Sequence, residues 1–469
     1  MKGDKSNCNN RDKPDDEDKG AASRRSGKNT RGGGAGEGEA QTAFLVGLQR
    51  HGQEPAEAAA LLGELRELVA NLAVPIAGSV VVRLREDSPR LLVGSGKAVE
   101  LAAEARAVGA NLLVFDDELS AAQQRNWERD TGLRVIDRQE VILDIFAARA
   151  STREAVLQVR LAQLEHQLPR LKHLWSHLDR QRGGGSTQRD AGEKQIEMDQ
   201  RLIRERIAKV RAELDDVIRR RATQRKQRRR VPVPSAAIVG YTNAGKSSLL
   251  NALTGAGVYA ADKLFATLDP VTRRLTLPGG RTLLLTDTVG FVRRLPHRLV
   301  EAFKATLEEA VRTDFLIHVV DLSSPEHETH WRTTREVLTE IGAADKPILT
   351  VFNKTDACAD DAPKFAARAQ HPDAQFVSAK TGAGLSGLLA ILEERATAGR
   401  ESASLLIPHD RHDFLGELHT AGAVLSERHT AEGVVVEALL PPRLQAAAAA
   451  FATQKKSAGK GTRRRQRAR

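Results

Sequence analysis

The first third of the chain alternates short apolar runs with longer stretches in which apolar residues recur at helical spacing. The runs predict strands at 44–48, 79–84, 91–94, 112–115 and 135–136. The stretches between them predict helices at 55–71, 97–108, 120–131 and 139–149. Because strands that alternate with helices favour parallel pairing, we predict a small α/β domain with a parallel sheet over 41–150. Gly94-Ser95-Gly96-Lys97 is too short for a phosphate loop and is interpreted as a turn.

A different periodicity follows this domain. Apolar residues recur at alternating spacings of four and three from Leu157 to Leu178, and the periodicity resumes from Ile196 to Val217. Two helices with such seams predict an antiparallel helical hairpin over 151–230, ending in a basic linker. Pro169 should bend the first helix. The break at 180–193 is glycine-rich and basic, and it supplies candidate RNA contacts at Arg182, Gly183, Gly184, Gly185 and Arg189. In the alternative, the hairpin only bridges two domains. That role explains the helices but not the glycine-rich, basic composition of the break.

Later apolar runs at 236–239, 282–286 and 348–352 predict the strands of a second α/β domain over 231–398. Beyond it, runs at 405–407 and 434–439 flank a helical stretch at 414–421, which predicts a small α+β domain over 399–453. The terminal segments 1–40 and 454–469 have little apolar content, and the second is strongly basic. We expect both to be disordered.

Four short motifs follow in order. They are Gly240-Tyr241-Thr242-Asn243-Ala244-Gly245-Lys246-Ser247, Asp287-Thr288-Val289-Gly290, Asn353-Lys354-Thr355-Asp356 and Ser378-Ala379-Lys380. One such pattern arises easily by chance, but an ordered set beside predicted strands does not. The first motif leads into a helix expected to open at Ser248, which is also a candidate nucleotide-binding residue. The backbone amides of the motif can surround a phosphate anion. The set therefore predicts a nucleotide site on a P-loop domain.

The residue types assign a role to each part of this site. Lys246 should reach the β- and γ-phosphates, and the Gly290 amide should face the γ-phosphate. Ser247 and Asp287 are candidate Mg²⁺ ligands. Thr267 in Phe265-Ala266-Thr267 should join the metal shell only when a triphosphate is bound. The candidate catalytic residues are Lys246, Asn243, Thr267 and Gly290.

Base selection is expected from Asn353, Lys354 and Asp356. The aspartate would accept from guanine N1–H and the exocyclic amine, while the lysine stem stacks on the ring. The Ser378-Ala379-Lys380 loop would hold the O6 side. Adenine lacks both donors, so the wrong base leaves the carboxylate unpaired, which can cost roughly 10⁴-fold in specificity. The predicted activity is the hydrolysis of GTP.

Two residues bear on the rate of that reaction. Phe291 stands where many Ras-type GTPases carry the glutamine that orients the attacking water. We therefore expect slow hydrolysis until a partner completes the site. Asn243 stands three residues after Gly240, as in GTPases that bind K⁺ beside the phosphates. Turning the loop explains the residue equally well, so both roles stay open.

Composition narrows the setting. The chain is 41% hydrophobic and 28% charged, and no run of about 18 apolar residues predicts a membrane span. Its N-terminus lacks the apolar core of an export signal, and its two cysteines fit the cytoplasm. Segments 219–230 and 455–469 carry eight positive charges each against a net charge of +11, which leaves about −5 elsewhere. RNA contact is expected there, as well as at the hairpin loop.

Together these residues resemble the HflX-type GTPases, a ribosome-associated family of translation-factor-like proteins. The resemblance covers about residues 43–442. Its more specific signatures are Gln123-Gln124-Arg125-Asn126, Arg134-Val135-Ile136-Asp137-Arg138, Leu143-Asp144-Ile145-Phe146, Gln163, Gln167-Leu168-Pro169-Arg170-Leu171, Phe265-Ala266-Thr267-Leu268-Asp269-Pro270, and Phe291 followed by Leu295-Pro296-His297. The resemblance implies GTP-dependent binding to the large (50S) ribosomal subunit and its rRNA. It further implies that the hairpin loop lies near the peptidyl transferase centre and that 70S ribosomes are split under stress. We expect a cytoplasmic monomer.

The chain departs from this family in two places. Residues 189–194 are Arg-Asp-Ala-Gly-Glu-Lys where the family usually has Arg-Gly-Pro-Gly-Glu-Thr, and Arg294 replaces a common acidic residue. Our leading hypothesis is a GTPase that dissociates or rescues ribosomes. The alternative is an RNA-binding assembly or storage factor in which nucleotide only regulates binding. A tRNA-modification GTPase is disfavoured because the sequence has no evident cysteine-bearing modification domain.

Overall fold

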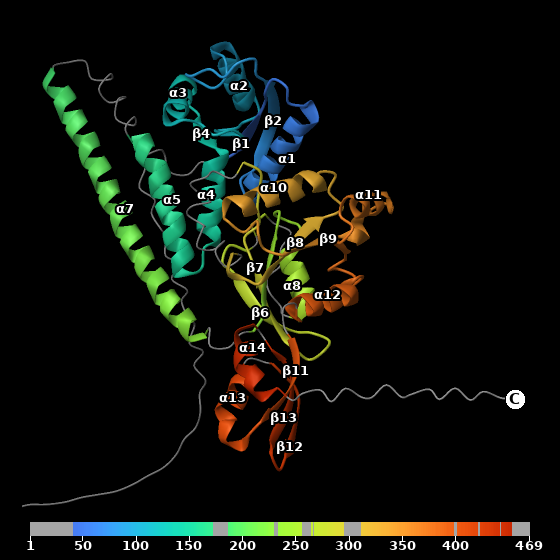
Figure 1. The fold of residues 1–469 in the computed structure, drawn as a ribbon. Helices are drawn as coiled ribbons and strands as arrows, with labels where there is room; N and C mark the ends of the chain where they lie inside the picture. Colours follow the sequence, from blue (N-terminus) through green and yellow to red (C-terminus); the bar gives the residue numbers. More distant parts are fainter. Residues whose placement is uncertain are drawn as a thin grey trace, which may run out of the picture. The chain divides into compact units, whose positions relative to one another are not determined.

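A computed structural model describes residues 41–171, 186–228, 233–255, 264–265, 267–294, 311–397, 401–420, 423–440 and 442–452. Predictions for 1–40, Arg182, Gly183, Gly184, Gly185, Ala266 and 454–469 lie outside these residues. Within them the chain forms a parallel sheet, a pair of long helices, a P-loop sheet and an antiparallel sheet (Figure 1). The predicted α/β multidomain fold class is confirmed.

The N-terminal sheet is parallel throughout and has the strand order β2-β1-β3-β4. Its strands are β1 (Ala43–Gln49), β2 (Ile76–Arg83), β3 (Leu112–Phe115) and β4 (Arg134–Asp137). They alternate with α1 (Pro55–Asn71), α2 (Ser95–Ala107), α3 (Ala121–Thr131) and α4 (Arg138–Arg149). Side chains of α1 and α4 form one apolar cluster with the sheet, and those of α2 and α3 form another. This is the arrangement that the alternating pattern predicted.

Two local predictions in this part are wrong. The segment 91–94 is not a strand: it forms only an isolated Ser88–Leu92 bridge. Leu91 and Leu92 are nevertheless buried in the core, which explains the apolar run. An apolar run reports burial, which a loop can also provide. The turn predicted at 94–97 is also wrong in extent, because α2 already begins at Ser95.

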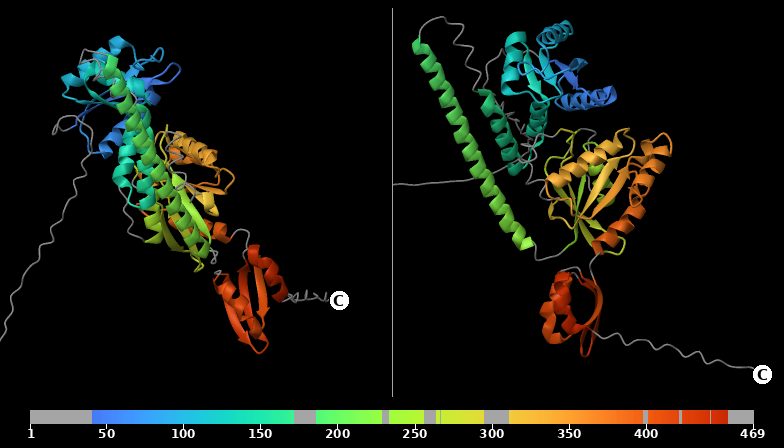
Figure 2. Two further views of the ribbon diagram at one scale, coloured as in Figure 1. Left: turned by 90° about the vertical axis from the view of Figure 1, so that its left-hand side faces the viewer. Right: turned by 45° about the horizontal axis from the view of Figure 1, so that its top comes forward.

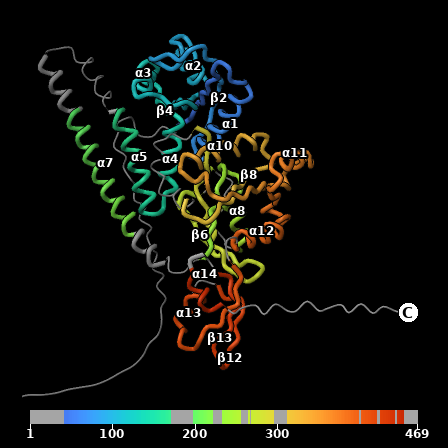
Figure 3. Tube along the Cα trace, in the orientation of Figure 1, coloured from blue at the N-terminus to red at the C-terminus, as the bar shows by residue number. Residues whose placement is uncertain are grey.

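The helical pair consists of α5 (Arg153–Leu171) and α7 (Ser186–Arg228), which lie side by side in Figures 2 and 3. Their seam buries Leu157 and Leu164 against Ile207 and Val210, as the periodicity predicted. Pro169 lies inside the last turns of α5.

The predicted extent of the second helix is wrong at both ends. Because α7 begins at Ser186, Arg189 is helical and does not lie in a loop, and the basic stretch from Arg219 to Arg228 is helical and not a linker. Arg, Lys, Gln and Glu are good helix formers, so a helix can continue where an apolar seam ends. Apolar periodicity detects the seam and misses such polar ends.

The P-loop sheet has six strands in the order β10-β9-β8-β5-β7-β6. They are β5 (Ser235–Gly240), β6 (Val271–Thr276), β7 (Thr282–Asp287), β8 (Phe315–Asp321), β9 (Ile348–Asn353) and β10 (Gln375–Phe376). Only β6, which the sequence did not reveal, pairs antiparallel within the described sheet. Its helices are α8 (Lys246–Thr254), α10 (His327–Glu340), α11 (Ala362–Gln370) and α12 (Leu385–Thr397), with a 3₁₀ turn at Thr355–Ala357. The carboxyl ends of β5, β7 and β9 deliver three motifs to one edge of the sheet.

The C-terminal sheet is antiparallel in the order β11-β13-β12. It contains β11 (Glu401–Ile407), β12 (Val424–Thr430) and β13 (Gly433–Leu440), with α13 (His412–Thr420), α14 (Pro442–Ala448) and 3₁₀ turns at His409–Arg411 and Ala449–Phe451. Strand β12 was not predicted, because most of its residues are polar and exposed. Among the helices that the structure describes, none is both long and apolar enough to cross a bilayer.

Candidate nucleotide site

The four motifs surround one cavity of about 360 Å³. The residues that line it are Thr242, Asn243, Gly245, Lys246, Ser247, Ser248, Phe265, Thr267, Thr288, Gly290, Asn353, Lys354, Asp356, Ala357, Ala379 and Lys380. All of these except Ala357 were predicted for the site. The sequence therefore predicted where the cavity would be, although several motif residues have other roles, described below.

The phosphate loop is shaped by close backbone approaches. Gly240 and Gly245 have φ of +151° and +87°, and a Cβ at these positions would overlap the Val319 carbonyl oxygen and the Asn353 side-chain nitrogen, respectively. Asn243 also has a left-handed backbone, with φ of +60°. Glycine is needed at the first two positions because no side chain fits.

Lys246 is buried at the base of this loop. Its Nζ donates to the Tyr241 carbonyl oxygen at 2.8 Å. Burial lowers the pKa of Lys246 to about 8, although Asp287 acts in the opposite direction. A phosphate in the cavity would favour the charged form of this ammonium group, so the site is suited to an anion.

Three side-chain oxygens meet beside the lysine. Ser247 Oγ and Thr267 Oγ1 donate to Asp287 Oδ2 at 2.6 and 2.8 Å, and the two hydroxyls are 2.9 Å apart. The other Asp287 oxygen, Oδ1, is buried without a hydrogen-bond partner. Burial raises the pKa of Asp287, against the effect of Lys246. Hard oxygen donors with an unpaired buried carboxylate oxygen fit Mg²⁺.

Gly290 lies directly against the phosphate loop. A Cβ at Gly290 would be 2.8 Å from Thr242 Cγ2 and 2.9 Å from Lys246 Nζ. The next residue fixes this approach, because Phe291 N–H donates to the Gly240 carbonyl at 3.1 Å and its own carbonyl accepts from Thr242 N–H at 2.8 Å. The Phe291 ring is 1% exposed and belongs to the core.

The base-reading motif divides into supporting and exposed groups. Asn353 Nδ2 donates to the Ala244 carbonyl at 3.0 Å, and its Oδ1 accepts from Ala379 N–H at 3.0 Å. Ser378 Oγ donates to Asp356 Oδ1 at 2.5 Å, and this bond lowers the pKa of the exposed Asp356 carboxyl. Asn353 and Ser378 thus position their neighbours, whereas Asp356 is free to meet a base on its other oxygen.

Sequence reasoning missed the partners that hold these groups. Asp321 Oδ2 pairs with Lys354 Nζ at 2.7 Å, and Lys354 has a left-handed backbone with φ of +63°. Asp321 is the last residue of β8 and is paired in register with Asn353. An acidic residue at the end of the neighbouring strand could therefore have indicated the partner of Lys354. Asp269, near Thr267, accepts from the hydroxyls of Ser151 and Thr152 that precede α5.

A mainly parallel P-loop sheet, a glycine-rich loop suited to an anion, a cluster of oxygen donors suited to a divalent cation and an exposed aspartate beside the cavity are the features of a GTP-binding P-loop GTPase. Sequence families match the chain in succession, described as "GTP-binding GTPase N-terminal" at 59–147, "GTP-binding GTPase Middle Region" at 149–228 and "50S ribosome-binding GTPase" at 235–354. The chain belongs to the HflX family of GTPases and is a GTP hydrolase.

Three relatives illustrate this membership. The GTPase HflX of Akkermansia muciniphila is 49% identical over 86% of this chain and 94% of its own length. That of Lacrimispora saccharolytica is 45% identical over 87% of this chain and 95% of its own length. That of Escherichia coli is 42% identical over 80% of this chain and 88% of its own length.

Proposed function

We propose that this GTPase binds the large ribosomal subunit in the cytoplasm as a monomer and uses GTP to dissociate or rescue ribosomes. The observation that carries the proposal is the match of residues 235–354, which enclose most of the nucleotide cavity, to a family described as a 50S ribosome-binding GTPase. The proposal extends the family relation from nucleotide binding to the partner on which hydrolysis acts.

In this proposal the phosphate end of the cavity performs the chemistry. Lys246 binds the β- and γ-phosphates, the Gly290 amide meets the γ-phosphate, and Ser247, Thr267 and Asp287 hold Mg²⁺. When bound, Mg²⁺ neutralises charge on the phosphate oxygens. Phe291 cannot orient water from within the core, so a ribosomal partner completes the site. Asn243, which lines the cavity, is the candidate for holding K⁺.

The helical pair supplies the second part of the proposal. Arg204, Arg206 and Lys209 are exposed on α7, and Arg189 lies near its first turn. Basic side chains along a helix bind phosphate backbones through counterion release. We propose that these residues and the 182–185 segment contact rRNA, while the apolar seam holds the two helices together.

The deciding experiment measures turnover and splitting together. GTP hydrolysis is followed with and without 50S subunits, and dissociation of 70S particles is followed by light scattering. We expect subunits to raise hydrolysis by roughly a hundredfold, the scale that a completing partner can reach. Subunit binding with unchanged slow hydrolysis and no splitting would instead support the nucleotide-regulated assembly or storage factor.

Charge variants test the RNA contact. Arg182→Gln with Arg189→Gln should weaken 50S binding and reduce its salt dependence. With fewer phosphate contacts, binding releases fewer counterions. Arg274→Gln with Arg428→Gln removes the same charge from exposed strand positions and serves as the matched control. Basal hydrolysis should be unchanged in both pairs. Equal loss of subunit binding in the two pairs would contradict a specific contact at the hairpin.

A further inference from the structure

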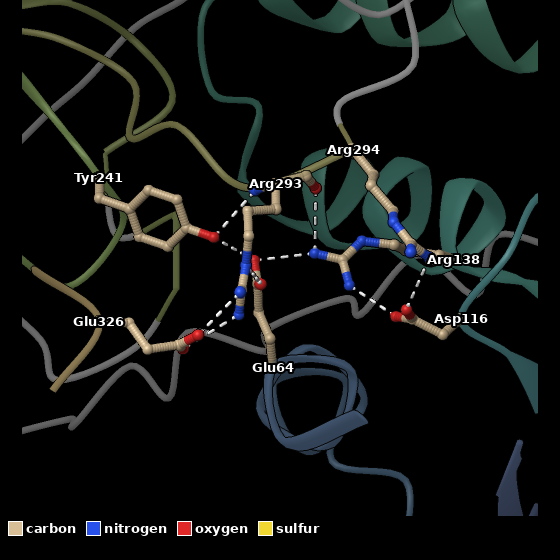
Figure 4. A network of polar contacts seen from close by, with 7 residues as sticks. All are labelled: Glu64, Asp116, Arg138, Tyr241, Arg293, Arg294 and Glu326. Carbon is tan, nitrogen blue, oxygen red and sulfur yellow. Dashed lines mark hydrogen bonds and ion pairs between the residues drawn. The ribbon is translucent and has the colours of Figure 1, made fainter. Parts of the chain in front are cut away.

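The backbone of Arg293, three residues after Gly290, is held at both its N–H and its carbonyl group. Its N–H donates to Tyr241 Oη at 2.9 Å, and its carbonyl oxygen accepts from Arg138 Nη2 at 3.2 Å. Tyr241 belongs to the phosphate loop and Arg138 begins α4 beside the N-terminal sheet. Figure 4 shows both side chains pointing toward this peptide.

Glu64 of α1 connects the two side chains. Its Oε1 accepts from the Tyr241 hydroxyl at 2.7 Å and lies 2.8 Å from Arg138 Nη2, and its Oε2 accepts from Arg293 Nε at 3.2 Å. Glu64 is only 9% exposed, so these contacts are shielded from water. Burial and Glu64 both raise the pKa of Tyr241, so its hydroxyl stays protonated and acts as a donor to the carboxylate.

Further charges hold the next residue. Arg294 pairs with Asp116 and Asp117 at 3.3 Å each, and Asp116 also pairs with Arg138 at 2.7 Å. Arg294 has a left-handed backbone with φ of +53°, which is costly for a side chain of this kind. Such a conformation persists only where surrounding contacts impose it. The segment after Gly290 is therefore constrained by the N-terminal sheet and its helices.

This constraint reaches the phosphate site along a short path. Phe291 pairs with the phosphate loop through two backbone hydrogen bonds, and Gly290 lies against Lys246. Phe291 and Arg293, both anchored, hold the chain directly after Gly290, which limits the freedom of the Gly290 amide. The Tyr241 ring also stacks on His330 of α10, with centroids 3.9 Å apart, so the hydroxyl is aimed by a fixed ring.

We propose that Tyr241 is a positioning residue for GTP hydrolysis, which with Glu64 holds the Arg293 peptide and thereby keeps the Gly290 amide at the γ-phosphate position. The tyrosine ring does not line the cavity wall; it belongs to the apolar cluster that joins the phosphate loop to α1 and α4. The rate of the chemical step is thus set partly by α1, far from the cavity in sequence. The inference rests on the phosphate-site roles of Lys246 and Gly290 and needs no ribosome.

Tyr241→Phe is the test, because it removes only the hydroxyl and keeps the stacked ring. GTP is bound first and single-turnover hydrolysis is then measured on the full chain without ribosomes. We expect the rate to fall roughly tenfold, since a hydrogen bond to a charged group contributes that order of stabilisation. GDP affinity should stay within about twofold of wild type, as the loop backbone that binds the β-phosphate is unchanged. Hydrogen exchange at 289–294 with a non-hydrolysable GTP analogue should become faster.

Thr334→Val is the matched control. It removes a buried hydroxyl that donates to the His330 carbonyl at 2.9 Å, in the same neighbourhood and outside the phosphate site. Its hydrolysis should equal that of wild type. Glu64→Gln in the Tyr241→Phe background should slow hydrolysis further, because it also weakens the contacts of Glu64 with Arg138 and Arg293.

Several results would overturn the inference. Wild-type or faster hydrolysis by Tyr241→Phe would do so, as would a parallel loss of GDP affinity, which indicates general damage to the loop. Equal slowing by Thr334→Val would also do so. The site assignment is checked separately, since Lys246→Ala must lose most of its triphosphate affinity whatever Tyr241 does.

Discussion

Replacing Asn353 by alanine tests how the base end and the phosphate end of the cavity are joined. The Asn353 side chain is 2% exposed, and both its polar atoms are used, one by Ala244 O and one by Ala379 N–H. Alanine leaves that carbonyl and that amide unpaired. Each unsatisfied buried group costs about 1–3 kcal/mol, so the predicted loss for the two groups is about 2–6 kcal/mol. This is a large part of the stability of a typical domain.

Hydrogen exchange of peptides from β5 and β9 measures this loss locally, because a chain with several domains need not unfold in a single step. Protection there should fall at least about thirtyfold, the factor that corresponds to 2 kcal/mol. GTP and GDP affinities should fall together, since the phosphate loop and the Ala379 loop both lose their support.

The neighbouring Thr355→Val is the control for that experiment. It removes a single hydrogen bond to the Val377 carbonyl, of 3.1 Å at a half-buried position, and should cost about 1 kcal/mol with little change in affinity. Protection within twofold of wild type in Asn353→Ala would refute the linking role. A loss of GTP affinity without loss of protection would instead favour direct contact of Asn353 with the base.

Other consequences follow from the same geometry. Because burial places the pKa of Lys246 near 8 and phosphate favours its charged form, GDP affinity titrated by fluorescence should be flat below pH 8 and fall up to tenfold per pH unit above it; no change between pH 8 and 9.5 would contradict this. Asp356→Asn should relax the preference for GTP over xanthosine triphosphate in competition assays, and an unchanged preference would argue against base reading. Replacing K⁺ by Na⁺ should slow hydrolysis, and Asn243→Ala should remove that difference; equal rates in both salts would leave Asn243 as a loop residue. Leu164→Ala should destabilise the helical pair by about 2–5 kcal/mol in local exchange, whereas loss of protection below about 0.5 kcal/mol would contradict a buried seam.

Much of the nucleotide site was predictable because its chemistry is local in sequence. Glycine, lysine and serine in the phosphate loop were expected from the chemistry of a phosphate. Asp287 and Asp356 were expected from that of a divalent cation and a base, whatever surrounds them. Parallel strands then carry these residues to one sheet edge, which is why 15 of the 16 lining residues were expected. The seam of the helical pair was predictable for a similar reason, since periodic burial is written into the spacing of Leu157 and Leu164.

The partners of those residues were decided only by the tertiary structure. Whether Asn353 meets a base or supports two loops depends on which groups lie opposite it, and no spacing encodes that. Tyr241 and Glu64 are 177 residues apart, yet they share a hydrogen bond, because two separately formed sheets place their helices and loops in contact. Local patterns select strands, helices and reactive groups. Burial and charge pairing between distant segments determine which of those groups remain free for the nucleotide and which hold the site in place.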